Sequence, residues 1–398
     1  MNSIWKNYSS TILLIAFLIA GGVCGVVRPS AARFVGPIGD IFLNFLFAMV
    51  IPLVFFSVSV SFMKLKTGSG IGRTLGRIIF SFFVIWVVLS LFAYLSTLIV
   101  NPLGNDFTIS SAGAERTDET WGETLVGTVS VSDFTLLFSK NHLLPLMIFS
   151  ALLGAGVSLC GESGSAFGNF LEGGCTVISK ATGILMKAAP IGLGCYFAKT
   201  VANTGSDLLE GYLRVFVIFW VLSLITVGLI FPATVRAMKG KGSLKKWWKA
   251  ILPPSLTAMA TTSSSVVIPG NIETAKAMGT DTAVAEATIP IATNLLKAGS
   301  VMGYVLKGVL LMSICGIPSV GIIQALTVTG ISILSAAVIG AVAGGDVTGA
   351  VLTCTLLGVS PELAGIIIII GTIIDIPATL VNSQSTVVAT LITDNFKK

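Results

Sequence analysis

Residues 258–270 read Ala-Met-Ala-Thr-Thr-Ser-Ser-Ser-Val-Val-Ile-Pro-Gly, and this stretch decides the fold more than any other. Five consecutive hydroxyl side chains, Thr261 to Ser265, stand between apolar segments and precede Pro269-Gly270. Hydroxyls at membrane depth are costly unless they line a cavity or bond to the backbone. In a continuous helix they would bond to carbonyls one turn back. A run of five before a proline favours instead the tip of a helical hairpin, whose backbone N–H groups can hold a carboxylate.

The composition around this stretch is that of an integral membrane protein. Of 398 residues, 54% are hydrophobic and 11% are charged, whereas roughly 25% are charged in an average globular chain. A soluble fold could not cover its surface with so few charges. The net charge of +6 therefore indicates basic residues kept on the cytoplasmic side, and we expect the lipid bilayer, not a nucleic acid, as the partner.

Side chains for metal binding or covalent catalysis are scarce. The chain has one histidine and six cysteines, which are scattered singly without a Cys-X-X-Cys pair. This pattern predicts no disulfide and no metal site. No nucleophile–base pair stands out either, so we expect neither an enzyme nor a cofactor.

Uncharged segments of about 20 residues predict membrane-spanning helices. Five such segments, and a sixth weaker one with a kink at Pro190, precede residue 240; they are 7–27, 41–63, 78–105, 143–161, 177–203 and 215–235. After residue 250 the apolar runs are shorter and are broken by single charges, glycines and prolines. These short pieces favour re-entrant or broken helices.

The loops predict the orientation. Segments 64–77 and 236–249 contain only basic charges, whereas segment 106–133 contains six acids and one base. The positive-inside rule places the two basic loops in the cytoplasm. Both termini of a multi-pass protein in the cytoplasmic (inner) membrane would then also be cytoplasmic.

A second hairpin is predicted over about 325–357. Its middle, Gly340 to Gly349, contains four glycines and Asp346, which is too rich in glycine to propagate a helix well. Glycines also serve close helix packing in lipid, but the acid at mid-span favours a gate or a binding loop.

Two charged residues stand in otherwise apolar helices, Lys297 and Asp375. Asp375, Thr379, Asn382 and Thr386 are spaced i, i+4, i+7 and i+11, which places them on one helix face. A charge in the membrane costs roughly 2.5–3.5 kcal/mol on insertion scales, so a functional role is the first expectation. The alternative is a structural Lys297–Asp375 ion pair without a ligand.

The order of these motifs resembles the dicarboxylate/amino acid:cation symporter family, the glutamate-transporter-like elevator carriers. The resemblance covers nearly the whole chain, with a triple serine at Ser263 to Ser265, prolines at Pro269 and Pro290, and Gly299-Ser300 ending the seventh helix. It implies an all-α integral membrane protein with eight transmembrane helices, two re-entrant helical hairpins and inverted repeats. It also implies a homotrimer, with a scaffold and a mobile transport domain. The expected segments are 7–64 and 134–205 for the scaffold, 74–105 and 211–398 for the transport domain, and about 251–280 and 325–357 for the two hairpins.

The chain departs from the family at its sodium ligands. Leu296-Lys297-Ala298 stands where the family has Asn-Met-Asp, and Thr386 stands where it has an aspartate. Ala378 replaces the arginine that grips a substrate side-chain carboxylate. Because Na⁺ prefers oxygen ligands, carboxylates above all, the changes imply transport without Na⁺, with Lys297 as a tethered cation.

The family's binding logic then predicts a site for a small-molecule substrate. Asp375 should pair with a substrate ammonium, Asn382 and the serine tip should hold its carboxylate, and Thr379 should line the side-chain pocket. The predicted substrate-binding residues are Ser263, Ser264, Ser265, Ser300, Gly344, Gly345, Asp375, Ala378, Thr379 and Asn382. The lost arginine favours small neutral amino acids.

Two rival functions remain open from the sequence. Lys297 could bind a second carboxylate, which would give H⁺-coupled transport of C4-dicarboxylates or acidic amino acids. An ion channel with re-entrant pore loops would also fit the hydroxyl tip, but it leaves Lys297 and Asp375 unexplained.

Overall fold

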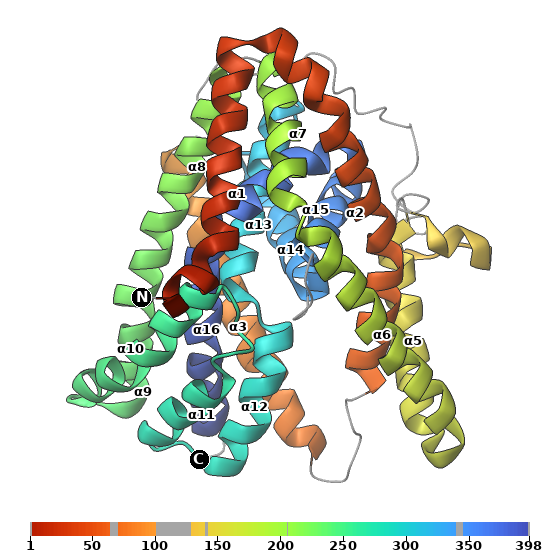
Figure 1. Ribbon diagram of the computed structural model, residues 1–398. Coiled ribbons are helices and arrows are strands. Elements are labelled where there is room, and N and C mark those ends of the chain that lie inside the picture. The colour runs from red at the N-terminus through yellow and green to blue at the C-terminus, as the bar shows by residue number, and fades with distance from the viewer. Residues whose placement is uncertain are drawn as a thin grey trace.

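The computed structural model describes residues 2–63, 71–100, 129–139, 142–204, 206–339 and 345–396, and within these ranges it is helical without strands (Figure 1). The α-helices are α1 Asn2–Val27, α2 Pro29–Met63, α3 Ile71–Ile99, α5 Leu143–Leu159, α6 Ser165–Met186, α7 Ala189–Thr204, α8 Ser206–Ile225, α9 Phe231–Lys239, α10 Ser243–Thr261, α11 Ile268–Ala277, α12 Thr282–Leu295, α13 Ala298–Ile314, α14 Ile322–Ile339, α15 Gly345–Leu356 and α16 Ala364–Asn395. Short 3₁₀ segments are Phe134–Phe138, Gly161–Gly164 and Pro361–Leu363, and a π-turn, Thr226–Ile230, joins α8 to α9.

Several helices are long and apolar enough to cross a membrane. In the described part of the chain there are five, or six if the bent pair α6–α7 is one span, and three shorter apolar helices accompany them. The outward faces carry exposed apolar side chains, such as Phe34, Leu159 and Leu229. Apolar surface on this scale is typical of lipid contact. The prediction of an all-helical membrane protein is therefore confirmed, and the count of eight spans stays a prediction.

The weaker apolar segment, predicted over 177–203, bends next to the predicted kink at Pro190 but begins earlier than predicted. It is a pair of helices, α6 and α7, bent by 60° at a short break, and α6 begins at Ser165, twelve residues before the predicted start. Pro190 is the second residue of α7, where its missing N–H costs no helical hydrogen bond. The start was missed because polar residues of α6 interrupt its apolar pattern.

The basic segment 236–249 is mostly helical, which corrects the prediction of a loop. α9 ends at Lys239 and α10 begins at Ser243, so only a three-residue turn separates them. Gly240 and Gly242 make this turn possible, because their φ angles are 82° and 99°, values that favour glycine. Most of the predicted acidic segment 106–133, and 64–70 of the first basic loop, lie outside the described residues.

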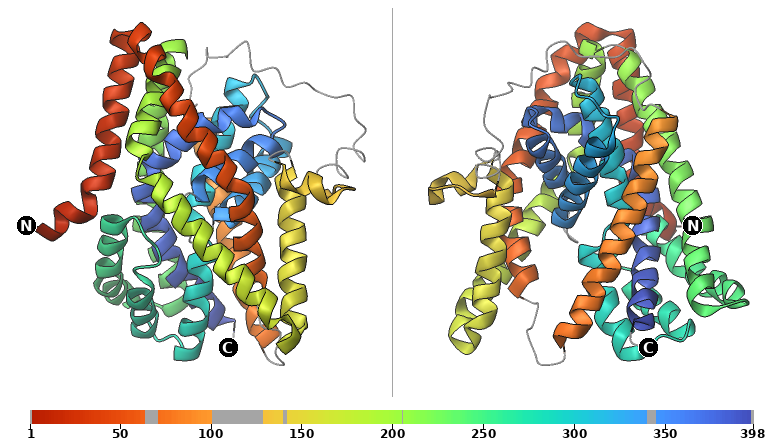
Figure 2. Two further views of the ribbon diagram at one scale, coloured as in Figure 1. Left: turned by 45° about the vertical axis from the view of Figure 1, so that its right-hand side comes forward. Right: turned by 180° about the vertical axis from the view of Figure 1, so that it is seen from behind.

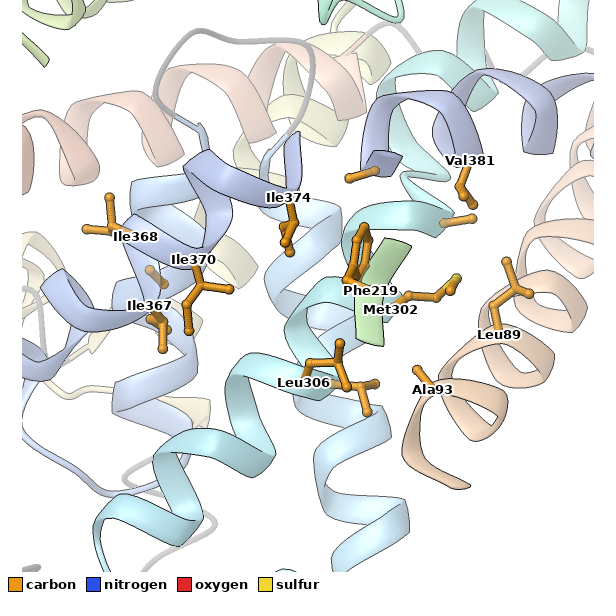
Figure 3. Close-up of a cluster of buried hydrophobic side chains, with 14 of the residues drawn as sticks. Leu89, Ala93, Phe219, Met302, Leu306, Ile367, Ile368, Ile370, Ile374 and Val381 are labelled. Atoms are coloured by element: carbon orange, nitrogen blue, oxygen red, sulfur yellow. The ribbon is translucent and has the colours of Figure 1, made fainter. Parts of the chain in front are cut away.

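α13 is the centre of the buried core. Nearly every one of its side chains is buried, and it packs against α3, α8, α14 and α16. Figure 3 draws Met302 and Leu306 of α13 with Phe219 of α8 and Leu89 of α3. Burial on all sides explains why α13 is largely apolar, with Lys307 as its one charged residue.

The first helices pack closely around α7. α1 and the first half of α2 both contact α7, and Figures 1 and 2 show α1 and α7 side by side. Glycines make this possible, since a Cβ on Gly39 would overlap Tyr196 and one on Gly192 would overlap Phe42. Small residues at such contacts are common between helices in membranes.

Two pairs of helices fold back on themselves. In the first hairpin (243–277), α10 and α11 run antiparallel, and the Thr274 hydroxyl donates to the Ala250 carbonyl at 2.9 Å. In the second hairpin (322–356), the hydroxyls of Ser335 on α14 and Thr353 on α15 lie 2.9 Å apart. The predicted boundaries are 251–280 and 325–357, so α10 begins eight residues before the first of them, and the middle of the second hairpin, 340–344, lies outside the described residues.

Candidate functional site

The first hairpin, α13, α15 and α16 enclose a cavity of about 510 Å³. Its apolar wall comes from Leu14, Leu46, Met186 and Leu193 on α1, α2, α6 and α7. The other lining residues are largely polar: Thr262, Ser263, Ser264, Ser265, Lys297, Ser300, Gly303, Lys307, Gly345, Asp346, Val347, Ile368, Gly371, Thr372, Ile374, Asp375, Ala378, Thr379 and Asn382. A cavity of this size with convergent polar groups is typical of a small-molecule site.

The serine tip of the first hairpin faces this cavity. α10 ends where Thr262 takes a left-handed conformation, with φ 47°. The Thr261 hydroxyl donates to the Thr257 carbonyl one turn back, at 2.8 Å. In the described part of the chain, the hydroxyls of Ser263, Ser264 and Ser265 form no such bond. The three serines therefore keep hydroxyl groups available to a ligand, as expected for a tip and not for a continuous helix.

A second helix break brings Lys297 to the cavity. α12 ends at Leu295 and α13 begins at Ala298, and Lys297 between them is left-handed with φ 39°. The Trp86 indole N–H donates to the carbonyl of Leu296, one of the acceptors that the break leaves without a helical partner. In the described ranges, Thr262 and Lys297 are the two non-glycine residues with positive φ. Such strained residues cluster at functional sites.

The side chain of Asn382 on α16 caps the N-terminus of α13. Its side-chain oxygen accepts from the backbone N–H groups of Gly299 at 2.8 Å and Ser300 at 3.3 Å. Its amide nitrogen donates to the Ser300 hydroxyl at 3.3 Å. The oxygen of Asn382 thus accepts within the protein, and one of its two amide N–H groups has no acceptor among the residues that the structure describes.

Asp375 lies on the same face of α16, one turn before Thr379. The Thr379 hydroxyl donates to the Asp375 carboxylate at 3.4 Å, and the carboxylate is open to the cavity. Lys297 is only 8% exposed. Neither side chain forms a direct ion pair with any residue that the structure describes, although the charges of Lys297 and Asp375 attract each other across the cavity. The cavity thus contains one unpaired ammonium and one unpaired carboxylate.

Two further charged residues lie at the cavity, Asp346 and Lys307, and of these Lys307 was missed from the sequence. The Lys307 ammonium forms an ion pair with the Asp346 carboxylate at 2.6 Å, and the Tyr304 hydroxyl donates to the same carboxylate oxygen at 2.8 Å. A signal existed, because Ser300, Gly303 and Lys307 are spaced i, i+3 and i+7, which is one helix face. Asp346 was noticed in the sequence, but its partner was not.

The structure brings nearly all the predicted site residues together. Those that line the one cavity are Ser263, Ser264, Ser265, Lys297, Ser300, Gly345, Asp375, Ala378, Thr379 and Asn382. Gly344 lies outside the described residues. Thr386, the last residue of the polar stripe, does not line the cavity.

The positions where the resemblance implies sodium ligands do not fit a sodium ion. Leu296 and Ala298 are apolar and fully buried. The Thr386 hydroxyl donates to the Ser383 carbonyl at 2.8 Å and accepts from the Asn271 amide at 3.1 Å. An amide N–H group therefore points at the oxygen that a hard cation would need, and no carboxylate of the described residues bonds to this hydroxyl.

The cavity is polar and charged, lies inside a bundle of apolar helices, and is lined by a hairpin tip and a helix break. These features are those of a membrane transport protein for small polar solutes. The sequence model of the Sodium:dicarboxylate symporter family matches residues 11–396, and the chain belongs to this family.

Curated relatives of this family carry different substrates in their names. The chain is 24% identical to a C4-dicarboxylate transport protein of Laribacter hongkongensis, over 92% of this chain and 84% of the relative. It is 25% identical to a proton/sodium-glutamate symport protein of Geobacillus stearothermophilus, over 92% and 89%. It is 23% identical to a serine/threonine transporter of Acinetobacter baylyi, over 100% of both chains. The family is thereby one of transporters of dicarboxylates and amino acids, and the substrate has to be argued from the site.

Proposed function

We propose that this protein is a secondary active transporter of small neutral amino acids that works without Na⁺. One observation carries the proposal: Lys297 and Asp375, a cation and an anion without ion-pair partners in the described chain, line the same cavity. A neutral amino acid is a zwitterion with one ammonium and one carboxylate. Its charges match the two unpaired groups one to one, whereas each extra substrate carboxylate would lack a partner.

Each polar group then has a role. Asp375 pairs with the substrate ammonium, and Lys297, the tip serines and the free N–H of Asn382 receive its carboxylate. Ser300 and Thr379 line the side-chain pocket, where Ala378 contributes no charge. A small hydroxyl-bearing or aliphatic side chain suits this pocket, in line with the serine/threonine transporter among the relatives.

In this proposal, the ammonium of Lys297 replaces the Na⁺ ion that the family resemblance implies. Its ammonium neutralises the field of Asp375 and of backbone carbonyls from a fixed place on the chain, so no soluble cation has to bind first. If the lysine releases its proton during the cycle, transport is coupled to H⁺; if it stays charged, the protein is an exchanger without a coupling ion.

The same proposal includes the architecture of the family. Counting α1 and α5 as spans gives eight transmembrane helices, with the two hairpins re-entrant and both termini cytoplasmic. The scaffold comprises 7–64 and 134–205, and the transport domain comprises 74–105 and 211–398. The transport domain moves as an elevator within a homotrimer.

Transport of C4-dicarboxylates or acidic amino acids is the second candidate. It is favoured by the names of relatives such as the C4-dicarboxylate transport protein of Laribacter hongkongensis, and by the free ammonium of Lys297. In this candidate Lys297 binds the second carboxylate, and H⁺ is the coupling ion. Asp375 argues against the C4-dicarboxylates, because such a dianion would meet this carboxylate without an ammonium of its own. An ion channel, the candidate of another class, predicts conductance without saturation.

Thermal stabilisation of the purified protein tests these candidates directly. A ligand that binds the folded state raises the unfolding temperature by mass action. We expect serine, alanine or threonine to stabilise the protein equally in sodium and in choline buffer, and aspartate and succinate to do so less. Greater stabilisation by succinate or aspartate would favour the second candidate, and no stabilisation by any solute would contradict a carrier of either kind.

A further inference from the structure

An ion pair of cavity-lining residues lies between α13 and the second hairpin. The Lys307 ammonium is 2.6 Å from the Asp346 carboxylate, and the exposed fractions of the two side chains are 2% and 38%. The Tyr304 hydroxyl donates to the side chain and to the backbone carbonyl of Asp346, both at 2.8 Å. The same ammonium lies 4.3 Å from the centre of the Tyr304 ring. Asp346 is therefore fixed by two residues of α13, while its carboxylate still faces the cavity.

This pair lies one helical turn from Asp375. A Cβ added to Gly371 would overlap the Asp346 carboxylate and come within 2.7 Å of the Lys307 ammonium. Gly371 and Asp375 are spaced i, i+4 on α16, so they lie on one face of this helix. The pair thus occupies space that glycine leaves open, on the side of the cavity where the proposed ammonium site begins.

The charges of Lys307 and Asp346 determine which substrate side chains the cavity can bind. Lys307 alone would be a cation lining the cavity, able to hold a substrate side-chain carboxylate. With Asp346 at 2.6 Å, that charge is matched inside the protein. Removing only one member of a buried pair leaves the other charge uncompensated.

We propose that the Lys307–Asp346 ion pair determines substrate charge, because Asp346 neutralises an ammonium that would otherwise accept an acidic side chain. The pair then restricts the carrier to amino acids with uncharged side chains. This inference rests on the proposed function, the binding of neutral amino acids in the same cavity. A purely structural pair would change stability when broken, but it would not change preference in a direction set by the sign of the remaining charge.

The test is the ratio of aspartate to serine affinity, measured by competition against labelled serine on the purified full-length protein. Asp346→Asn keeps the shape and frees the charge of Lys307, so the ratio should rise about tenfold or more, as expected for one charge-assisted hydrogen bond. Lys307→Met frees the opposite charge, so the ratio should fall and free lysine should begin to compete. The double variant, without either charge, should return close to the unmodified ratio.

Asp394→Asn is the matched control. Asp394 forms a buried ion pair with Lys239 at 3.5 Å, away from the cavity, so its loss should leave the ratio unchanged. If both Asp346→Asn and Lys307→Met bind serine and have the same ratio of aspartate to serine affinity, this inference is overturned while the proposed function stands. If Asp346→Asn does not fold, a ratio that does not fall in Lys307→Met overturns it. Failure of the unmodified protein to bind any amino acid would overturn the proposed function as well.

Discussion

The side-chain oxygen of Asn382 accepts a hydrogen bond from the backbone N–H of Gly299 at 2.8 Å, which ties the middle of α16 to the first turn of α13. The helix break just before Gly299 is thereby fixed relative to the polar face of α16. Lys297 at the break and Asp375 on that face consequently line one cavity. A substrate that bridges the two charges would bind two helices that are already held together, so little ordering has to accompany binding.

Loss of the Asp375 charge should weaken the binding of every neutral amino acid. Asp375→Asn keeps the shape and removes the partner of the substrate ammonium, at a cost of about 1.5–3 kcal/mol for a charge-assisted hydrogen bond. Equilibrium binding of labelled serine measures it. Asp40→Asn is the control, because Asp40 pairs with Lys199 at 2.6 Å away from the cavity. Equal affinity in the Asp375 variant and in the control would remove Asp375 from the site.

Lys297 can be tested with its backbone conformation kept. Lys297→Gly suits the φ of 39°, because glycine adopts positive φ without strain, and Lys297→Arg retains a charge. We expect Lys297→Gly and Lys297→Met to lose serine affinity about tenfold, without a gain of Na⁺ dependence, since no carboxylate ligand returns. Wild-type affinity in Lys297→Gly would show that the ammonium has no role in binding.

Ala378→Arg should move the preference towards acidic amino acids. Ala378 lines the cavity, so a guanidinium there would offer a bidentate partner to a side-chain carboxylate. Competition of aspartate against serine should improve in the variant, whereas Ala378→Gln, of similar length without the charge, should not improve it. Aspartate that already competes better than serine in the unmodified protein would refute the neutral-substrate proposal.

The packing of α13 on α16 can be tested with two glycines. A Cβ on Gly299 would lie 3.0 Å from the Cα of Ala378, a backbone atom. A Cβ on Gly303 would meet the end of the Ile374 side chain at 3.1 Å, which can move aside. Gly299→Ala should therefore destabilise the protein by about 1–3 kcal/mol, as overpacking does, and Gly303→Ala by less. Thermal unfolding in detergent compares the two, and equal losses would contradict this packing.

The hairpin tip and the polar face of α16 could be predicted because their local patterns are decisive. Five hydroxyls before a proline cannot continue an apolar helix comfortably, and an i, i+4, i+7 spacing places Asp375, Thr379 and Asn382 on one face. Thr386 shares the face but lies about 16 Å further along the axis than Asp375, at 1.5 Å per residue. It therefore falls beyond the cavity, and the Asn271 amide bonds to it there.

The Lys307–Asp346 pair could not be predicted in the same way. Its two residues lie on different helices, and their contact depends on the space beside Gly371. The start of α6 was missed for a different reason. Its exposed polar residues interrupt the apolar run from which a membrane-spanning helix is predicted. Contacts between distant segments and irregular helices are thus what local sequence patterns cannot supply.

Uptake of serine into proteoliposomes, with all Na⁺ replaced by choline at fixed pH, tests the central claim most directly. The claim is that Lys297 replaces the coupling ion, because Leu296, Ala298 and Thr386 offer no carboxylate to a sodium ion. The account predicts saturable uptake or exchange of serine at the same rate in choline as in sodium. Serine uptake that requires, or is strongly stimulated by, an inward Na⁺ gradient would contradict it.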